Sequence, residues 1–233
     1  MRKFMALVLI LCLALAAFPA AADAPGLTVV EENFYLRKNY GEKFDGVYIA
    51  KLRNDTGTPL YIDGCSLVLT DAEGGEAGKQ DFLSVSGSRY LEPGEISFIS
   101  MEARVNEGAA AAGYEIQLKT VPTDNLVLHD TVIELDGAEL RVSEGPYVNY
   151  YAAATVTNTG DGPLSRVNAA VALRADDGSL VQLVTFSLGQ NELAAGSTIT
   201  LVNGVDKRVV DYCAENNLAL AEVEACAWQS SGY

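Results

Sequence analysis

Two stretches of this chain, residues 52–74 and residues 155–178, follow the same pattern of strand and turn residues at an offset of 104 positions. The matched pairs are Asn54 with Asn158, Pro59 with Pro163, Leu69 with Leu173 and Gly74 with Gly178. These shared positions are turn formers and apolar residues, which a fold needs for its backbone angles and its core. The repeat therefore predicts a duplicated scaffold rather than a duplicated active site.

Both copies read as short strands separated by turn signals about 8 to 12 residues apart. Residues 47–53 alternate so that Tyr48, Ala50 and Leu52 share one face of a strand. The Cys-Trp-Cys pattern of antibody domains is absent from the sequence. We therefore predict an all-β protein with two tandem immunoglobulin-like β-sandwich domains.

Two short segments, residues 107–113 and 207–215, are predicted to be helical crossovers within these domains, the first because it contains four consecutive alanines. The best domain boundary is the Pro-Thr-Asp-Asn sequence at 122–125. The predicted organisation is a leader at residues 1–22, domain 1 at 23–122 and domain 2 at 123–233.

The leader has the composition of a secretory signal peptide. Arg2 and Lys3 precede an apolar run at residues 4–17, and Ala20 and Ala22 supply small residues for cleavage. An uncleaved membrane anchor is disfavoured because proline and small residues interrupt the run before it reaches about 20 apolar residues. We expect cleavage after Ala22 and a secreted or cell-envelope location.

The acidic balance of the chain restricts its partners. The full chain has a net charge of −15, and removal of the leader leaves 14 basic and 31 acidic side chains. Such a surface repels phosphate backbones and anionic lipid, so we expect neither nucleic acid nor a membrane as partner after cleavage.

Three cysteines follow the leader, so a framework of several disulfides is excluded. Cys65 shares the inward face of its strand with Leu67 and Leu69, which favours a small buried apolar residue. For Cys213 and Cys226 the sequence allows two alternatives. They are free thiols, or they form a disulfide that holds the second crossover against the last strand. Alternation places Cys226 on the side of that strand away from the core.

The pattern resembles the FxLYD-type domains of bacterial secreted proteins, in which a Phe-x-Leu-Tyr-Asp strand runs into an Asp-x-x-Gly tip and a Leu-x-Pro-Gly-Glu turn follows. The matching segments are Leu-Val-Leu-Thr-Asp at 67–71, Leu-Glu-Pro-Gly-Glu at 91–95, Val-Ala-Leu-Arg at 171–174, Asp-Asp-Gly at 176–178 and Leu-Ala-Ala-Gly at 193–196. The resemblance implies an immunoglobulin-like fold and an envelope location, and it implies no catalytic residues.

Catalytic motifs are scarce. His129 is the only histidine, and neither Gly-x-Ser-x-Gly nor His-Glu-x-x-His occurs. The acidic hairpin tips around Asp71 and Asp176 lack the ligand spacing of an EF-hand, so we expect solvated turns rather than calcium sites. We predict no catalytic residue, no cofactor and no metal, and hence no enzyme.

Tyrosines near the start of the second copy offer a candidate ligand surface, namely Tyr147 and Tyr151, because aromatic side chains on a sheet can hold sugars or peptides. The leading hypothesis is an exported, non-catalytic binding, adhesion or scaffold module whose partner is a protein or glycan at the cell surface. One alternative is a carbohydrate- or peptide-binding accessory module. A second is a hydrolase with paired carboxylates, which would need two of them in one cleft about 5–9.5 Å apart.

Overall fold

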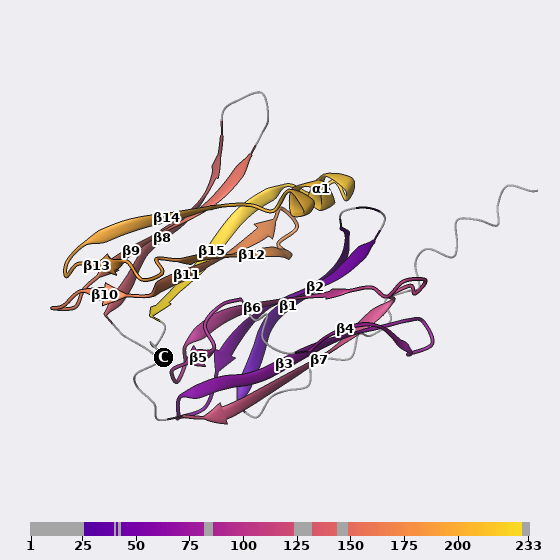
Figure 1. The fold of residues 1–233 in the computed structure, drawn as a ribbon, viewed down its shortest axis with the longest axis horizontal. Helices are drawn as coiled ribbons and strands as arrows, with labels where there is room; N and C mark the ends of the chain where they lie inside the picture. The colour runs from indigo at the N-terminus through magenta and orange to yellow at the C-terminus, as the bar shows by residue number, and fades with distance from the viewer. Residues whose placement is uncertain are drawn as a thin grey trace, which may run out of the picture.

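The computed structural model describes residues 26–39, 41, 43–81, 86–123, 132–143 and 149–229. Almost all of this part of the chain is antiparallel β-structure, which confirms the all-β prediction. The sheets stack face to face in four layers (Figure 1). Two layers come from residues 26–123, called here the N-terminal half, and two from residues 132–229, the C-terminal half.

The N-terminal half contributes β1 (Leu27–Lys38), β2 (Phe44–Asn54), β3 (Leu60–Thr70), β4 (Glu76–Asp81), β5 (Tyr90–Leu91), β6 (Ile96–Arg104) and β7 (Gly113–Pro122). One sheet has the order β1-β2-β6, and in the other β3 pairs with β4, β5 and β7. The core between these sheets contains the predicted face of β2 and the predicted face of β3, including Cys65.

The C-terminal half contributes β8 (Ile133–Val142), β9 (Tyr150–Asn158), β10 (Leu164–Ser165), β11 (Val167–Ala175), β12 (Leu180–Ser187), β13 (Glu192–Leu193), β14 (Thr198–Gly204), α1 (Lys207–Glu215) and β15 (Leu220–Gln229). Its sheets have the orders β14-β9-β8 and β12-β11-β15, with β10 paired to β13. This is the strand order of the N-terminal half repeated, except that a left-handed Arg166 (φ 57°) divides the strand equivalent to β3 into β10 and β11.

The two halves meet through an apolar layer, called here the seam. Its buried members are Tyr35, Val47, Ile49, Phe98, Ala170, Ala172, Leu180 and Leu183. They join the outer face of sheet β1-β2-β6 to the outer face of sheet β12-β11-β15, which are the two middle layers of the stack (Figure 1). Because the seam buries apolar side chains from both halves, it stabilises one relative placement of the halves.

Strand β2 has few polar residues because both of its faces are covered. Tyr48, Ala50 and Leu52 enter the core of the N-terminal half, as alternation predicts. Val47 and Ile49 point the other way and enter the seam, so both faces of this stretch are buried. An uninterrupted apolar run is typical of a strand that is covered on both sides.

The prediction of two helical crossovers is half right. Residues 207–215 form α1, whose Val209 and Cys213 pack into the core of the C-terminal half. Residues 107–113 are not helical. Gly108 has a left-handed backbone (φ 78°), and the amide of Ala112 bonds to Thr70 O. Four alanines between two glycines are too few to repay the cost of starting a helix.

The repeated asparagines are buried connectors inside each half. Asn54 Nδ2 donates to the carbonyls of Thr58 and Leu91 at 2.9 and 3.0 Å. Asn158 Nδ2 donates in the same way to Gly162 and Leu193 at 2.8 and 2.9 Å. Each ties the turn after its strand to the short strand across the sandwich, and neither has exposed surface.

Candidate functional site

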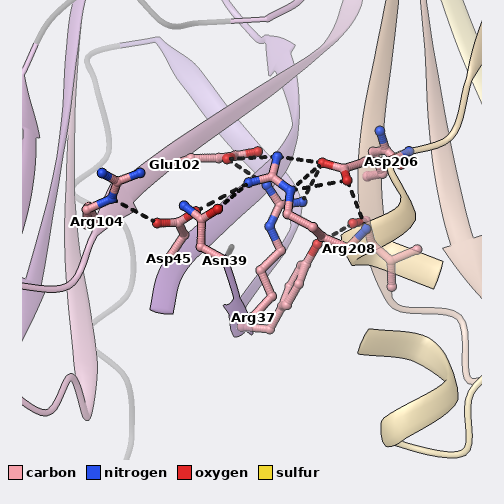
Figure 2. A network of polar contacts seen from close by, with 10 residues as sticks. Arg37, Asn39, Asp45, Glu102, Arg104, Asp206 and Arg208 are labelled. Carbon is pink, nitrogen blue, oxygen red and sulfur yellow. Dashed lines mark hydrogen bonds and ion pairs between the residues drawn. The ribbon is translucent and has the colours of Figure 1, made fainter. Parts of the chain in front are cut away.

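A group of charged side chains lies at the end of the seam nearest α1 (Figure 2). Arg37 of β1 and Glu102 of β6 come from the N-terminal half, while Asp206 and Arg208 come from the start of α1. Figure 2 shows the two arginines reaching between Glu102 on one side and Asp206 on the other. The group therefore connects the two halves where the apolar contact ends.

Arg37 is the most enclosed charge in this group, with 2% of its side chain exposed. Its Nη2 lies 2.6 Å from Glu102 Oε2, and its Nη1 lies 3.4 Å from Asp206 Oδ2. The Nε and Nη2 atoms make no hydrogen bond of acceptable geometry within the described chain. Nη2 keeps its charge contact with Glu102, so the cost of a buried donor without an acceptor, about 1–3 kcal/mol, applies to Nε.

Asp206 joins α1 to this group. It caps the helix by accepting the Arg208 amide at 2.9 Å, and its other oxygen accepts from Arg208 Nη2 at 2.6 Å. Its own amide donates to Gln182 Oε1 at 3.1 Å. Burial alone would raise the pKa of Asp206, but the hydrogen bonds from Arg208 and the charge of Arg37 outweigh it and hold the pKa below its usual value.

A cavity of about 310 Å³ lies beside Arg37, between the halves. Its lining comes from both: Tyr35, Arg37, Val47, Ser86, Ser100 and Glu102 from one, and Val181, Gln182 and Leu183 from the other. Glu102 is the one carboxylate among these lining residues. A pair of carboxylates of the kind a glycoside hydrolase uses is therefore not found within the lining of this cavity.

A second set of ion pairs lies along another part of the seam. Arg174 of β11 forms a bidentate pair with Glu31 of β1, with one contact at 2.7 Å, and also contacts Glu224 of β15 at 3.2 Å. Glu224 in turn pairs with Lys51 of β2. The hydrogen bond from Arg174 lowers the pKa of Glu31. These side chains are partly buried, so their attraction is screened less than that of surface pairs.

Acid should weaken the contact between the halves. A carboxylate whose pKa is lowered by folding stabilises the fold above its ordinary pKa, about 4.3 for Glu31 and 3.9 for Asp206, and this contribution disappears as the pH falls. We expect the melting temperature to drop steeply below about pH 4. The double variant Glu31→Gln, Asp206→Asn should show a shallower drop, while Glu139→Gln on an outer face should behave like the parent. Parallel pH profiles of parent and double variant would contradict this assignment.

The bridge considered between Cys213 and Cys226 is not formed in the structure, where both are free cysteines. Cys213 lies in the core of the C-terminal half, whereas Cys226 packs against the seam on the opposite face of sheet β12-β11-β15. Alternation placed Cys226 correctly away from the core, but the side it faces is covered by the other half. Burial raises the pKa of the Cys226 thiol to about 12, so it stays protonated at neutral pH.

Of the two predicted ligand tyrosines, Tyr151 is half-buried on β9, between Arg141 of β8 and Gly204 of β14. It shares the outer face of sheet β14-β9-β8 with Thr155 and Thr157 by strand alternation. Tyr147, His129 and the predicted leader at 1–22 lie outside the described residues.

The acidic hairpin tips use their oxygens within their own turns. Asp71 Oδ1 accepts the amides of Glu73 and Gly75, and Asp177 Oδ1 accepts from Ser179. Among the described residues no group of three or more histidine, cysteine or acidic side chains is placed to hold a metal ion. Within the same residues no helix has the length and apolar character needed to cross a membrane.

The sequence reasoning missed Arg37, Glu102, Asp206 and Arg208. Arg37 lies two residues after Tyr35 and therefore on the same face of β1, so this face has an aromatic side chain followed by a charged one. On a single sandwich that charge would face solvent. Its significance appears only once the second half covers the same face.

No protein-family model and no curated protein matches the chain. Solved structures give distant likenesses: a calcium-binding mutant of Bacteroides uniformis β-glucuronidase 2 (13% identity, 75% of this chain and 23% of that one, TM-score 0.26) and the CBM22-1–CBM22-2 tandem domain of Paenibacillus barcinonensis Xyn10C (10% identity, 89% and 87%, TM-score 0.18). The chain spans less than a quarter of the β-glucuronidase. At these TM-scores the likenesses carry no argument about fold or function.

Proposed function

We propose that this chain is an exported, non-catalytic protein of two tandem immunoglobulin-like domains, at 23–122 and 123–233, that acts as a binding, adhesion or scaffold module at the cell envelope or outside the cell. The observation that carries the proposal is the seam. An apolar layer with ion pairs at its borders holds the two sandwiches in one relative orientation. A rigid pair of domains can present the outer faces of its sheets to a binding partner. The resemblance to FxLYD-type domains, the leader sequence and the acidic surface agree with export.

A carbohydrate- or peptide-binding role is the second candidate, favoured by the position of Tyr151. Its neighbours across the sheet include Gly204, which has no side chain, so one flank of the ring is left open. Small threonines continue the same face, and Thr155 pairs with Thr200 at 2.9 Å. An aromatic ring beside small polar side chains can stack on a sugar or on a peptide.

Two measurements test these functions. The intact chain should sediment with isolated bacterial envelope material and should leave a panel of fluorogenic glycosides and esters unchanged; turnover of any of them would overturn the non-catalytic role. On a glycan array, Tyr151→Ala should weaken binding about tenfold, the effect of losing about 1.4 kcal/mol of contact. Tyr61→Ala, an aromatic change on the opposite outer face, is the matched control. Equal loss in both variants would exclude the Tyr151 surface.

A further inference from the structure

A cavity of about 560 Å³ lies at one corner of the N-terminal half, where the start of β2, strand β4 and the end of β6 come together. Its lining includes the basic side chains of Lys43, Lys79 and Arg104, the ring of Phe44 and the loop at residues 105–109. This volume is within the usual range for small-molecule sites. The N-terminal half alone supplies the lining, so this cavity is separate from the one beside Arg37 and from the Tyr151 surface.

The corner is closed by main-chain contacts between β4 and β6. The amide of Asn106, which follows β6, donates to Ala77 O of β4 at 2.7 Å. Gly78 of β4 lies so close to β6 that a Cβ at this position would approach Arg104 O to 2.2 Å, so only glycine allows this approach. The side chains that line the cavity are therefore not needed to close the corner.

The charge of this lining is opposite to that of the chain. Three of its described residues are basic and one, Glu107, is acidic, whereas the full chain has 16 basic and 31 acidic residues. Lys79 and Arg104 are exposed, and each lies near one aspartate, at 2.9 and 3.6 Å. Lys43 is exposed and takes part in none of the ion pairs found within the described chain. Exposed ion pairs are weak, so all three cations are available to an anionic ligand.

The second copy shows that the fold does not require these three cations. At the equivalent positions of the C-terminal half the sequence has a tyrosine, a leucine and an aspartate, namely Tyr147, Leu183 and Asp206. The two copies share the residues that packing and turns need. Three cations gathered at one corner of a single copy therefore indicate a role other than folding.

The other lining residues show which kind of anion fits. Phe44 is 41% exposed, and an exposed aromatic ring can stack on the face of a sugar. Asn106 adds an exposed amide that can both donate to and accept from sugar hydroxyls. Peptides often bind by adding a strand to a sheet edge, but here the bridge between Gly78 and Val105 occupies the end of β6. A saccharide therefore fits this corner better than a peptide does.

We propose that this corner cavity binds a short acidic oligosaccharide, such as a disaccharide of uronic acids. One sugar face lies on Phe44, the carboxylates bind Lys43, Lys79 and Arg104, and hydroxyl groups bind Asn106. The ligand is short because the acidic remainder of the surface repels an extended polyanion. The site adds to the carbohydrate-binding candidate at Tyr151 and does not depend on it.

The test is an NMR titration of the ¹⁵N-labelled full chain with digalacturonate, its neutral counterpart galactobiose, and a diglutamate peptide. Digalacturonate should shift the backbone signals of residues 106–108 saturably. Galactobiose should bind at least about tenfold more weakly, because it lacks the carboxylates. Added salt should weaken the binding of digalacturonate, because it screens exposed charges. The backbone signal of Tyr151 should stay in place, which separates the two surfaces.

Variants of exposed residues check the assigned roles without disturbing the core. Lys43→Gln should weaken the binding of digalacturonate about fivefold, and Phe44→Ala should weaken the binding of both sugars by about the same factor. Glu107→Gln removes the carboxylate of the lining and should strengthen the binding of digalacturonate about twofold. Lys119→Gln is the matched control: it makes the same change in net charge at an exposed lysine of the same half that does not line the cavity, so binding should be unchanged.

The proposal fails if digalacturonate produces no saturable shift at residues 106–108, or if galactobiose or the diglutamate peptide binds as tightly as digalacturonate. It also fails if Lys43→Gln and Lys119→Gln weaken binding equally, because net charge alone would then explain the effect. The glycan array and the substrate panel test the Tyr151 surface and the non-catalytic role separately, so failure at the corner cavity leaves both of those proposals standing.

Discussion

Replacing Phe98 by aspartate should separate the two halves. Phe98 is 1% exposed and belongs to the seam, the buried cluster that also contains Leu180 and Leu183 of the other half. Loss of a buried phenylalanine costs about 3–5 kcal/mol, and an unpaired carboxylate in the same place adds to the cost. Calorimetry of the parent chain should show one unfolding transition, and Phe98→Asp should show two. Small-angle scattering should report a larger radius of gyration for the variant.

A matched control comes from the duplication. Thr200 is equivalent to Phe98 when β14 is aligned with β6 by the Gly94 and Gly196 turns, but its side chain is exposed. Thr200→Asp should change the stability by at most about 0.5 kcal/mol. Should Phe98→Asp unfold the N-terminal half itself, Leu180→Asp, made from the other side of the seam, tests the same contact. A single transition at the parental temperature in both seam variants would contradict the two-body interpretation.

The second large effect should come from Asn158→Asp. The two side chains have nearly the same shape, but the amide donates to two buried carbonyls, those of Gly162 and Leu193, and a carboxylate cannot donate. Leaving both carbonyls unpaired and facing a negative charge should lower the free energy of unfolding by about 2–4 kcal/mol. Urea denaturation of the intact chain measures the difference.

Asn54→Asp is the internal replicate, because Asn54 makes the equivalent pair of bonds in the N-terminal half. Its loss should agree with that of Asn158→Asp within about 1 kcal/mol. Asn203→Asp is the control: Asn203 is exposed on β14 and donates one bond of 3.2 Å to Thr185 O, so the change should cost less than about 0.5 kcal/mol. A loss below this value in the buried variants would show that the repeated asparagine is dispensable.

The sequence predicted much of each half because alternation and turn residues are local signals. The core face of β2, the inward position of Cys65 and the helix at 207–215 all depend on contacts within one half, and all are confirmed. The alanine-rich segment was misread because composition was weighed above its flanking glycines. Its backbone instead bonds to Thr70 across the sheet, which no local propensity shows.

The seam and the candidate site were not predicted because they arise from contacts between residues far apart in the chain. Arg37 and Asp206 are separated by 169 positions, and their meeting depends on which sheets of the two halves pack together. The duplication suggests that equivalent sheet faces of the two copies have similar residues, but the outward positions of β3 and β11 differ between the copies. Ala170 and Ala172 stand on the seam where the first copy has Ser66 and Val68 on an outer face. Reading the copies for their differences at outward positions would have indicated the covered sheet.

The two halves contribute different, non-equivalent sheets to the seam, so their arrangement is head-to-tail rather than symmetric. The first copy contributes sheet β1-β2-β6, while the second contributes the sheet equivalent to β4-β3-β7, so the contact joins unlike surfaces. A contact between like surfaces closes after two members, whereas a contact between unlike surfaces can in principle be repeated by translation. Charged side chains on the outer face of the first copy, such as Lys79, Glu115 and Lys119, make that face unsuitable for another apolar neighbour. The outer faces of the two outermost sheets, β4-β3-β7 and β14-β9-β8, do not pack against the other half, unlike the outer faces of the two middle sheets. Residues on each of these outer faces can therefore change independently of the other half.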